Sequence, residues 1–518
     1  MKKYTKILAL LLAAAILISG CAAKTPATVA PGTTSPTSSD DKRTDLTIGI
    51  INEPTALDPT NSPYDIQSNA RIVGNVYEGL MTTEADGTIS GNVAENWDIS
   101  EDGLTYTFHL LGDVKFHNGD TLTAEDVKYT FDKAITSGFA VEVTGDMQET
   151  VAVDATTFVL KLSSPNASML QNIAQSRALY IANKAVAENL GENFTIAPIG
   201  GGSGPYKFES WVPGVSITLT ANEEYRKGAP SIKTVTFKFI HEPSSGAIAL
   251  ETGDIDVYAD LSLVDVPNLQ NNAKLQVDLV QSKYVYYICL NQQKEPYNNV
   301  LVRKAIAYAI NLDDLIMAVT NGIGGTKTGS LTATNCFGYL EFDPIEQDIE
   351  KAKALLAEAG YPDGITIKMV VCDGSRKKIG ETLQGMLPQA GITVELDVME
   401  MSAMAEMAVA SQHETLPQVA AGYIPDADSE LTDKVVSDSW GNFSRINDPH
   451  IDELMTAARK EIDPDKRIAM YHEVQQIVHD EMHIIPLYYV NTASAANADL
   501  KGFKTNPDLS YYLPSLSW

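Results

Sequence analysis

Cysteine is scarce in this sequence, which contains only four, and Cys289, Cys336 and Cys372 lie far apart. Their odd number and wide spacing suggest neither a disulfide framework nor a zinc site, so stability must come from apolar cores. Basic residues are also few, with 38 Lys and Arg against 67 Asp and Glu and a formal net charge of -29. This charge argues against nucleic acid and anionic lipid head groups as partners.

A hydrophobic run long enough to span a membrane is also missing from the N-terminal region. The apolar run 7–18 has 12 residues, whereas a transmembrane helix needs about 20. Lysines precede the run and Ser19-Gly20-Cys21 follow it, which is the pattern of a signal peptide over residues 1–20. The tetrad ending at Cys21 resembles the bacterial lipobox, in which the cysteine receives a lipid. We therefore expect Cys21 to be lipidated.

Residues 21–44 are rich in Thr, Pro, Ala and Ser and contain almost no large apolar side chain. Such a segment cannot bury enough surface to offset its conformational entropy, so we expect it to act as a flexible tether. The remaining 45–518 exceed what one core usually covers, which predicts two or three lobes. The protein should be exported and attached by its lipid to the outer face of the cytoplasmic membrane, or to the periplasmic side where an outer membrane is present.

Beyond the tether, short strand-like runs alternate with helical stretches, which predicts a mixed α/β fold. Residues 105–110 alternate apolar and polar side chains with the period of a half-buried strand. Asp448-Pro449 and Asp463-Pro464 each supply a cap and a first-turn proline for a helix. A strand is expected over 484–490, directly after the second of these helices.

Three catalytic or metal-binding patterns occur in incomplete form. His479 and His483 have the i, i+4 spacing of metal ligands, but Asp480 stands where the zincin pattern needs a glutamate. Ser375 and Lys378 fit S-x-x-K and 327–329 fit K-T-G, but their order is reversed relative to the β-lactam-binding serine enzymes. We therefore expect no catalytic residue, no metal site and no cofactor.

Several blocks resemble the family 5 extracellular solute-binding proteins, the receptors of oligopeptide, dipeptide and nickel ABC importers. The blocks stand in family order and cover nearly the whole chain after the tether. They are Leu57-Asp58-Pro59, Val76-Tyr77-Glu78-Gly79-Leu80, 102–110, 114–119, 122–127, Gly204-Pro205-Tyr206-Lys207-Phe208, Val302-Arg303-Lys304-Ala305 and 352–361.

This resemblance implies a two-lobed α/β fold of the periplasmic-binding-protein type, class II-like, with a hinged ligand cleft and an extra domain inserted in the N-terminal lobe. A cleft between lobes can bury a small solute, and its closure gives a permease a shape to recognise. The expected division is lobe I at 45–81, 199–288 and 490–518, extra domain II at 82–198, and lobe III at 289–489.

The resemblance also points to ligand contacts around 420–428. Peptide-binding relatives have a turn similar to W-x-x-D-x-x-D-P, whose first aspartate pairs with the ligand's amino group. Aligning Asp426 with the second aspartate places Tyr423 at the amine-anchor position, so the usual anchor is missing. A slip of one to three residues would recruit Asp426 or Asp428 instead.

Six further residues are candidate ligand contacts. Arg376 stands where dipeptide binders present an arginine to a carboxylate, although the neighbouring lysines also suit a solvated basic face. The others can offer an aromatic ring or an amide, and each can equally be structural: they are Trp440, Asn442, Phe443, Tyr488 and Asn291.

The expected function is capture of a peptide or peptide-like solute outside the cell and its delivery to the permease of an ABC importer. The alternatives are a receptor for a non-peptide solute such as a nickel complex, a surface serine acyl-transferase using Ser375 and Lys378, and a sensor that passes the solute to a chemoreceptor.

Overall fold

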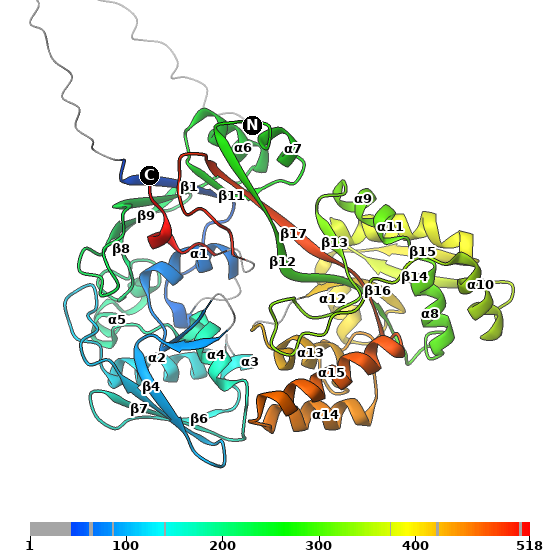
Figure 1. The fold of residues 1–518 in the computed structure, drawn as a ribbon, viewed down its shortest axis with the longest axis horizontal. Coiled ribbons are helices and arrows are strands. Elements are labelled where there is room, and N and C mark those ends of the chain that lie inside the picture. Colours follow the sequence, from blue (N-terminus) through cyan, green and yellow to red (C-terminus); the bar gives the residue numbers. More distant parts are fainter. Residues whose placement is uncertain are drawn as a thin grey trace, which may run out of the picture. The chain divides into compact units, whose positions relative to one another are not determined.

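The computed structural model describes residues 43–61, 66–84, 88–138, 141–372, 374–420, 424–506 and 510–518. Strands from distant parts of this chain join one large mixed sheet (Figure 1). In spatial order they are β15 (Ile392–Val398), β14 (Ile365–Val371), β16 (Thr415–Ala420), β12 (Leu275–Leu290), β17 (Ile484–Asn497), β11 (Val257–Leu261), β1 (Asp45–Ile50), β10 (Thr234–Phe239), β9 (Ser216–Ala221) and β8 (Tyr206–Val212), while β13 (Gly325–Lys327) also pairs with β17.

Two long strands, β12 and β17, run antiparallel through the middle of this sheet (Figure 1). Their pairing extends from Leu275 opposite Asn497 to Cys289 opposite Ile484. The register shifts between Gln281 and Val285, where the ladder is interrupted. The C-terminal part of β17 therefore pairs with β11, on the side of the sheet that contains β1. The C-terminal part of β12 pairs with β16, on the side that contains β14.

A smaller antiparallel sheet lies between β1 and β8 in the sequence. Its strands are β4 (Ala94–Ile99), β5 (Thr105–Leu110), β7 (Thr157–Leu162) and β6 (Met147–Ala152). The predicted alternation in β5 is confirmed, because Tyr106, Phe108 and Leu110 are buried in one apolar cluster. Helix α2 (Ala124–Ser137) packs on this sheet, and the carboxylate of Asp126 accepts hydrogen bonds from the backbone N–H and hydroxyl of Thr123 at its N-terminus.

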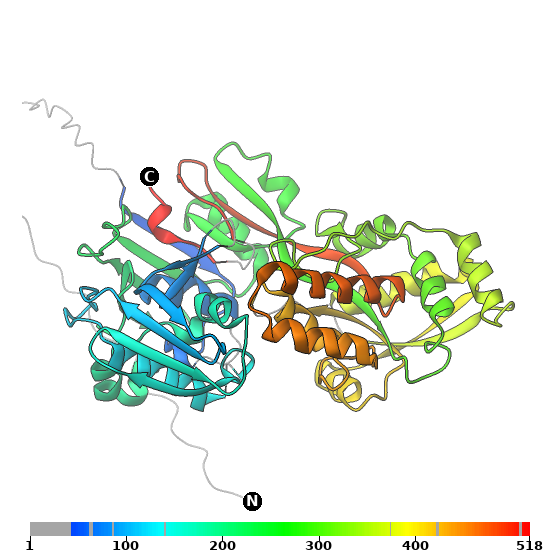
Figure 2. The same ribbon diagram turned by 60° about the horizontal axis from the view of Figure 1, so that its bottom comes forward.

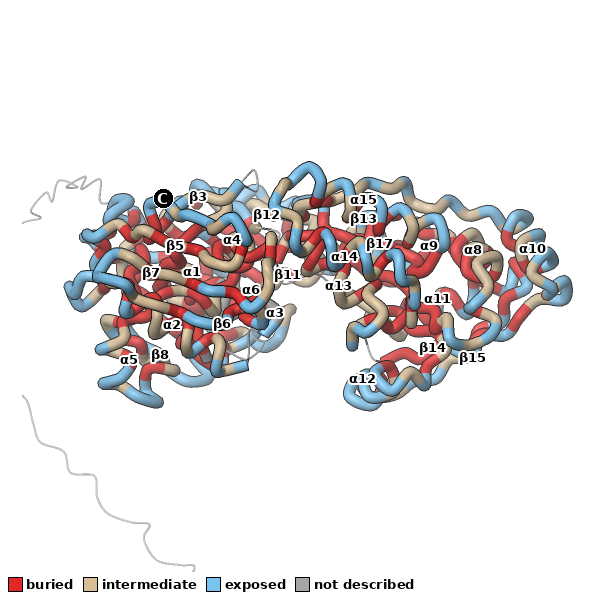
Figure 3. The backbone as a smooth tube through the Cα atoms, turned by 90° about the horizontal axis from the view of Figure 1, so that it is seen from below, coloured by how far each residue is buried: buried red, intermediate tan, exposed pale blue. Residues whose placement is uncertain are grey.

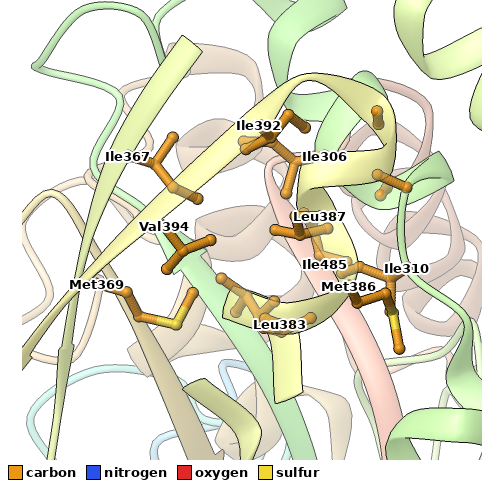
Figure 4. Packing of buried hydrophobic residues seen from close by; sticks show 14 of the residues in the cluster. Ile306, Ile310, Ile367, Met369, Leu383, Met386, Leu387, Ile392, Val394 and Ile485 are labelled. Carbon is orange, nitrogen blue, oxygen red and sulfur yellow. The ribbon is translucent and has the colours of Figure 1, made fainter. Parts of the chain in front are cut away.

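Four helices cover one face of the β12–β14–β15 part of the large sheet: α8 (Val300–Tyr308), α9 (Leu312–Thr320), α10 (Ile349–Glu358) and α11 (Ser375–Met386). Their apolar side chains pack against alternate strand residues. Leu383 of α11 and Leu387, directly after α11, lie in one group with Ile367 and Ile392 (Figure 4). This group of buried residues is called the apolar cluster below. It contains no charged side chain.

The opposite face of the same strands is covered by α12 (Met401–Val409), α13 (Ala427–Val435), α14 (Pro449–Lys460) and α15 (Pro464–Asp480). Helices α14 and α15 lie side by side (Figure 2), and each begins at the proline of a predicted Asp-Pro pair, with Asp448 and Asp463 accepting hydrogen bonds from backbone N–H groups. Most of α12 is exposed (Figure 3).

The other elements are short or lie near the sheet edges. They are α1 (Ile66–Val76), β2 (Met81–Thr83), β3 (Ile89–Gly91), α3 (Val141–Thr144), α4 (Met169–Gln175), α5 (Lys184–Leu190), α6 (Pro243–Thr252) and α7 (Val266–Leu269). In the part of the chain that is described, no helix combines the length and apolar character needed to cross a bilayer.

Candidate ligand cleft

A cavity of about 650 Å³ opens between two groups of segments that are distant in the sequence. One group is α3 with the loop before α4, and the other comprises α11, α12, the end of β16, α13 and the loop 436–448. Clefts of about 300–1,000 Å³ are the usual size for small-molecule sites. The cavity is therefore the leading candidate for a solute site among the described residues.

Apolar side chains line the cavity from both groups of segments, and several of them are exposed to solvent. Val141, Met401, Val409 and Trp440 have exposed fractions of 60%, 49%, 53% and 62%. Val143, Met404 and Phe443 line the same cavity and are buried. Exposed apolar side chains that gather at a concave surface mark a binding surface, and methionines adapt to ligands of different shape.

Arg376 lies in the first turn of α11 and lines the cavity. Its Nη2 donates to Oε1 of Gln418 at 3.0 Å, and its Nε is buried without a described partner. No carboxylate among the described residues forms an ion pair with it. The guanidinium is thus free to bind an anionic group of a ligand, bidentately where the geometry allows.

Two aspartates at the start of α13 are already paired within the protein. Asp426 caps the helix by accepting from the backbone N–H of Asp428 at 2.9 Å, and it accepts from Nη2 of Arg467 at 2.6 Å. Burial raises the pKa of Asp426, while Arg467 opposes that shift. Asp428 lines the cavity and is bonded by Nε and Nη2 of Arg459 at 3.0 and 2.8 Å.

Glu430 and Lys434 form a second charged pair one turn further along α13. Both are buried, with exposed fractions of 1% and 4%, and both line the cavity. Their side chains are 3.5 Å apart, from Nζ to Oε2. The shorter bond of Lys434, at 2.6 Å, goes to the backbone carbonyl of Glu430 instead.

Tyr287 on β12 forms part of the cavity wall beneath these charges. Burial raises the pKa of Tyr287 well above its ordinary value; Arg376 opposes this shift, whereas Asp433 and Glu430 add to it. The buried phenol of Tyr287 thus shares the cavity wall with Arg376, Glu430 and Asp433.

The two groups of segments around the cavity also touch each other directly. The hydroxyl of Ser168 accepts from Nη2 of Arg467 at 2.5 Å, and the N–H of Ala167 donates to the carbonyl of Arg459 at 2.8 Å. On the same side, the carboxylate of Asp146 accepts from Asn166 at 2.8 Å. These contacts position α14 and α15 against the loop before α4.

Of the predicted ligand contacts, Arg376, Asp428, Trp440 and Phe443 line the cavity, whereas Asp426 is not among its lining residues. Asn291 and Asn442 are fully buried, and their amides donate to the backbone carbonyls of residues 411 and 413, and 436 and 446. Tyr488 is buried in the apolar cluster. Tyr423 and Cys21 lie outside the described residues.

The incomplete motifs are found in ordinary structural surroundings. His479 stacks on Phe342 with ring centroids 4.2 Å apart. His483 is 9% exposed, and burial lowers its pKa to about 4. Lys327 forms ion pairs with Asp313 and Glu346. No cluster of three or more potential metal ligands occurs in the described ranges.

Sequence reasoning missed Glu430, Lys434, the apolar residues of α12, and the wall formed by α3 and the loop before α4. A glutamate four residues before a lysine normally indicates an exposed ion pair on a helix. The apolar spacing of Met401, Met404 and Val409 was a usable signal, because it places three side chains on one side of a short helix.

Comparison with protein families gives one match that covers most of the chain. Residues 88–441 match the middle region of the bacterial extracellular solute-binding proteins of family 5. Among characterised proteins, the chain is similar to the glutathione-binding protein GsiB of Salmonella paratyphi A, with 27% identity over 482 residues, covering 90% of this chain and 93% of that protein.

Solved structures agree with this match. The periplasmic binding protein DppA of Helicobacter pylori, associated with an ABC transporter and bound to the peptide STSA, has 26% identity and a TM-score of 0.72, covering 92% of this chain and 98% of that one. MoaA of A. tumefaciens R10, bound to mannopinic acid, has 28% identity and a TM-score of 0.68, covering 91% and 97%. The predicted α/β fold of the binding-protein type is confirmed.

Proposed function

Because the chain belongs to the family 5 bacterial extracellular solute-binding proteins, we propose that it captures a peptide or peptide-like solute outside the cell and delivers it to the permease of an ABC importer. The observation that carries the proposal is the cavity, which combines Arg376, without a carboxylate partner among the described residues, with buried carboxylates and apolar side chains. A peptide presents the matching groups: a carboxylate, an amino group and apolar side chains.

The ligands of the relatives support this choice of solute. Glutathione and the peptide STSA are built from amino acids, and the third relative was solved with mannopinic acid. The proposal includes no cofactor and no reaction, since the protein's task is to bind and release. A nickel complex is not favoured, because no described cluster offers metal ligands.

The proposed attachment and domain division complete this assignment. Lipidation at Cys21 would hold the receptor at the membrane beside its permease, and Cys21→Ser should move it from the membrane fraction of cells to the soluble fraction. Residues 82–198 are proposed as the inserted domain between parts of lobe I. Cooperative unfolding of that segment expressed alone would support the boundary, and its failure to fold would contradict it.

Thermal unfolding with candidate solutes tests the proposal. A ligand present at about 100 times its Kd stabilises the folded state by about 2.7 kcal/mol, so the Tm should rise with a tripeptide pool or with glutathione. A mixture of neutral sugars at the same concentration is the control and should leave the Tm unchanged. A shift with mannopinic acid but with no peptide would contradict the peptide assignment and retain the receptor role.

A further inference from the structure

Glu430 is a buried carboxylate in the cavity wall with too few hydrogen bonds. Its side chain is fully buried and its Oε1 has no partner among the described residues. Its Oε2 has only the 3.5 Å contact with Nζ of Lys434. A carboxylate can accept several hydrogen bonds, so most of the capacity of Glu430 is unused.

Such an arrangement is costly unless a partner arrives from outside the protein. A buried charged group that loses hydrogen bonds to water is destabilised by more than a neutral one, and native proteins rarely leave such groups unpaired. Lys434 compensates the charge only in part, because it directs its short bond to the carbonyl of Glu430. The missing donor is therefore expected from the solute that fills the cavity.

The neighbouring charges indicate which kind of donor fits. Arg467 and Arg459 already pair with the two aspartates at the start of α13, Asp426 and Asp428, although Oδ2 of Asp426 has no partner among the described residues. Among these acidic groups Glu430 has the weakest cationic partner, while Arg376 has no carboxylate partner in the described structure. Glu430 and Arg376 line the same cavity, as does Tyr287.

We infer that Oε1 of Glu430 accepts a hydrogen bond from a primary ammonium group of the bound solute, and that this contact selects solutes with a free amino group. The inference rests on the proposed function and deepens it, since it assigns the amino end of the solute to α13. Glu430 thereby supplies an anchor in a chain that has Tyr423 where the aligned aspartate would stand.

Isothermal titration with two matched probes tests the inference: an equimolar pool of free tripeptides and the same pool N-acetylated. A charged hydrogen bond in a buried site corresponds to an affinity change of about 10- to 100-fold. Wild-type protein should therefore bind the acetylated pool about 10- to 100-fold more weakly. Glu430→Gln should bind the free pool more weakly by a similar factor and should no longer distinguish the two pools.

Two further variants control the result. Because Glu430→Gln leaves Lys434 without its partner, the double variant Glu430→Gln/Lys434→Gln removes both charges and should show the same loss. Glu406→Gln makes the same change of charge on an exposed residue of α12 outside the cavity lining, and its affinity and selectivity should equal those of wild type.

The outcomes separate the inference from the proposed function. Equal binding of both pools by the wild type, or undiminished binding by the Glu430 variants, overturns the inference and leaves the peptide receptor standing. Binding of neither pool by the wild type overturns the proposed function, and the inference with it. The comparison of the pools on the wild type alone decides the matter even if a variant does not fold.

Discussion

Neighbouring residues of the same strands face two different environments. Ile288, Ile367 and Leu487 enter the apolar cluster beneath α8–α11, whereas Cys289 and Val370 point to the side covered by α12–α15. The first side is packed mainly with apolar side chains, and the buried guanidinium of Arg303 on α8 donates to backbone carbonyls there. The second side buries Glu430, Lys434, Asp426 and Arg467 and borders the cavity.

The difference indicates that the two faces of the sheet have different roles. Close-packed apolar side chains stabilise a structure and leave little choice of geometry. Buried charges contribute little net stability, because desolvation offsets their attraction, but they impose strict requirements on what can bind beside them. We therefore expect substitutions on the first side to change stability, and substitutions on the second side to change affinity.

The largest effect is expected in the apolar cluster. Leu383→Ala removes a fully buried side chain and should lower the free energy of unfolding by about 2–5 kcal/mol. Urea denaturation measures this value, and affinity for the tripeptide pool should stay unchanged. Met401→Ala, in the cavity wall, is the matched control and should cost less than about 0.5 kcal/mol. Equal losses of stability in both variants would contradict the expected difference between the two sides of the sheet.

Low pH should lower the free energy of unfolding through His483, which follows Met482 of the apolar cluster in the chain. Burial lowers the pKa of His483 to about 4, and Arg303 adds to that shift while Asp448 opposes it. The unfolded chain, with a pKa near 6.5, takes up the proton first as the pH falls. Stability is therefore lost between about pH 6.5 and pH 4, by about 3 kcal/mol for this one group.

Urea denaturation at pH 7 and pH 4 should show that His483→Gln loses about 3 kcal/mol less than wild type over this range. His450→Gln is the control, because Glu473 raises the pKa of that exposed histidine and its contribution has the opposite dependence on pH. An unchanged acid loss in His483→Gln would show that its pKa in the folded protein is ordinary.

On the cavity side, Arg376→Met should lower affinity for the tripeptide pool by about 10- to 100-fold, the loss of about 1.5–3 kcal/mol from one charged hydrogen bond. The same pool with amidated C-termini should bind wild type and variant alike. Lys377→Met removes an adjacent cation that lies 4.0 Å from Glu381 and should change neither affinity nor stability. Similar losses in both variants would indicate a general charge effect.

Local patterns predicted much of the fold, and tertiary contacts explain what they missed. The alternation of 105–110 and the Asp-Pro caps at 448 and 463 depend on short-range geometry, and the structure has β5, α14 and α15 at those places. Arg376 and Asp428 were proposed from family resemblance, and Trp440 and Phe443 as aromatic rings that could stack on a ligand; all four line the cavity.

The opposite wall could not be predicted in this way. Val143 and Ser168 reach the cavity because the smaller sheet folds against helices almost 300 residues later in the chain, such as α15, whose Arg467 bonds Ser168. The burial of Glu430 and Lys434 likewise depends on the packing of α13 against β12 and α15, which their spacing alone does not reveal.

The three cysteines described at the beginning have a practical consequence. Cys289, Cys336 and Cys372 are all buried, with exposed fractions of 2%, 6% and 1%, and burial raises the pKa of Cys289 to about 12. The thiolate is the form that attacks thiol reagents, so these buried positions should remain unmodified in the native protein. A single cysteine introduced at exposed Ala403 on α12 could then carry a fluorophore at the rim of the cavity and report its occupancy in real time.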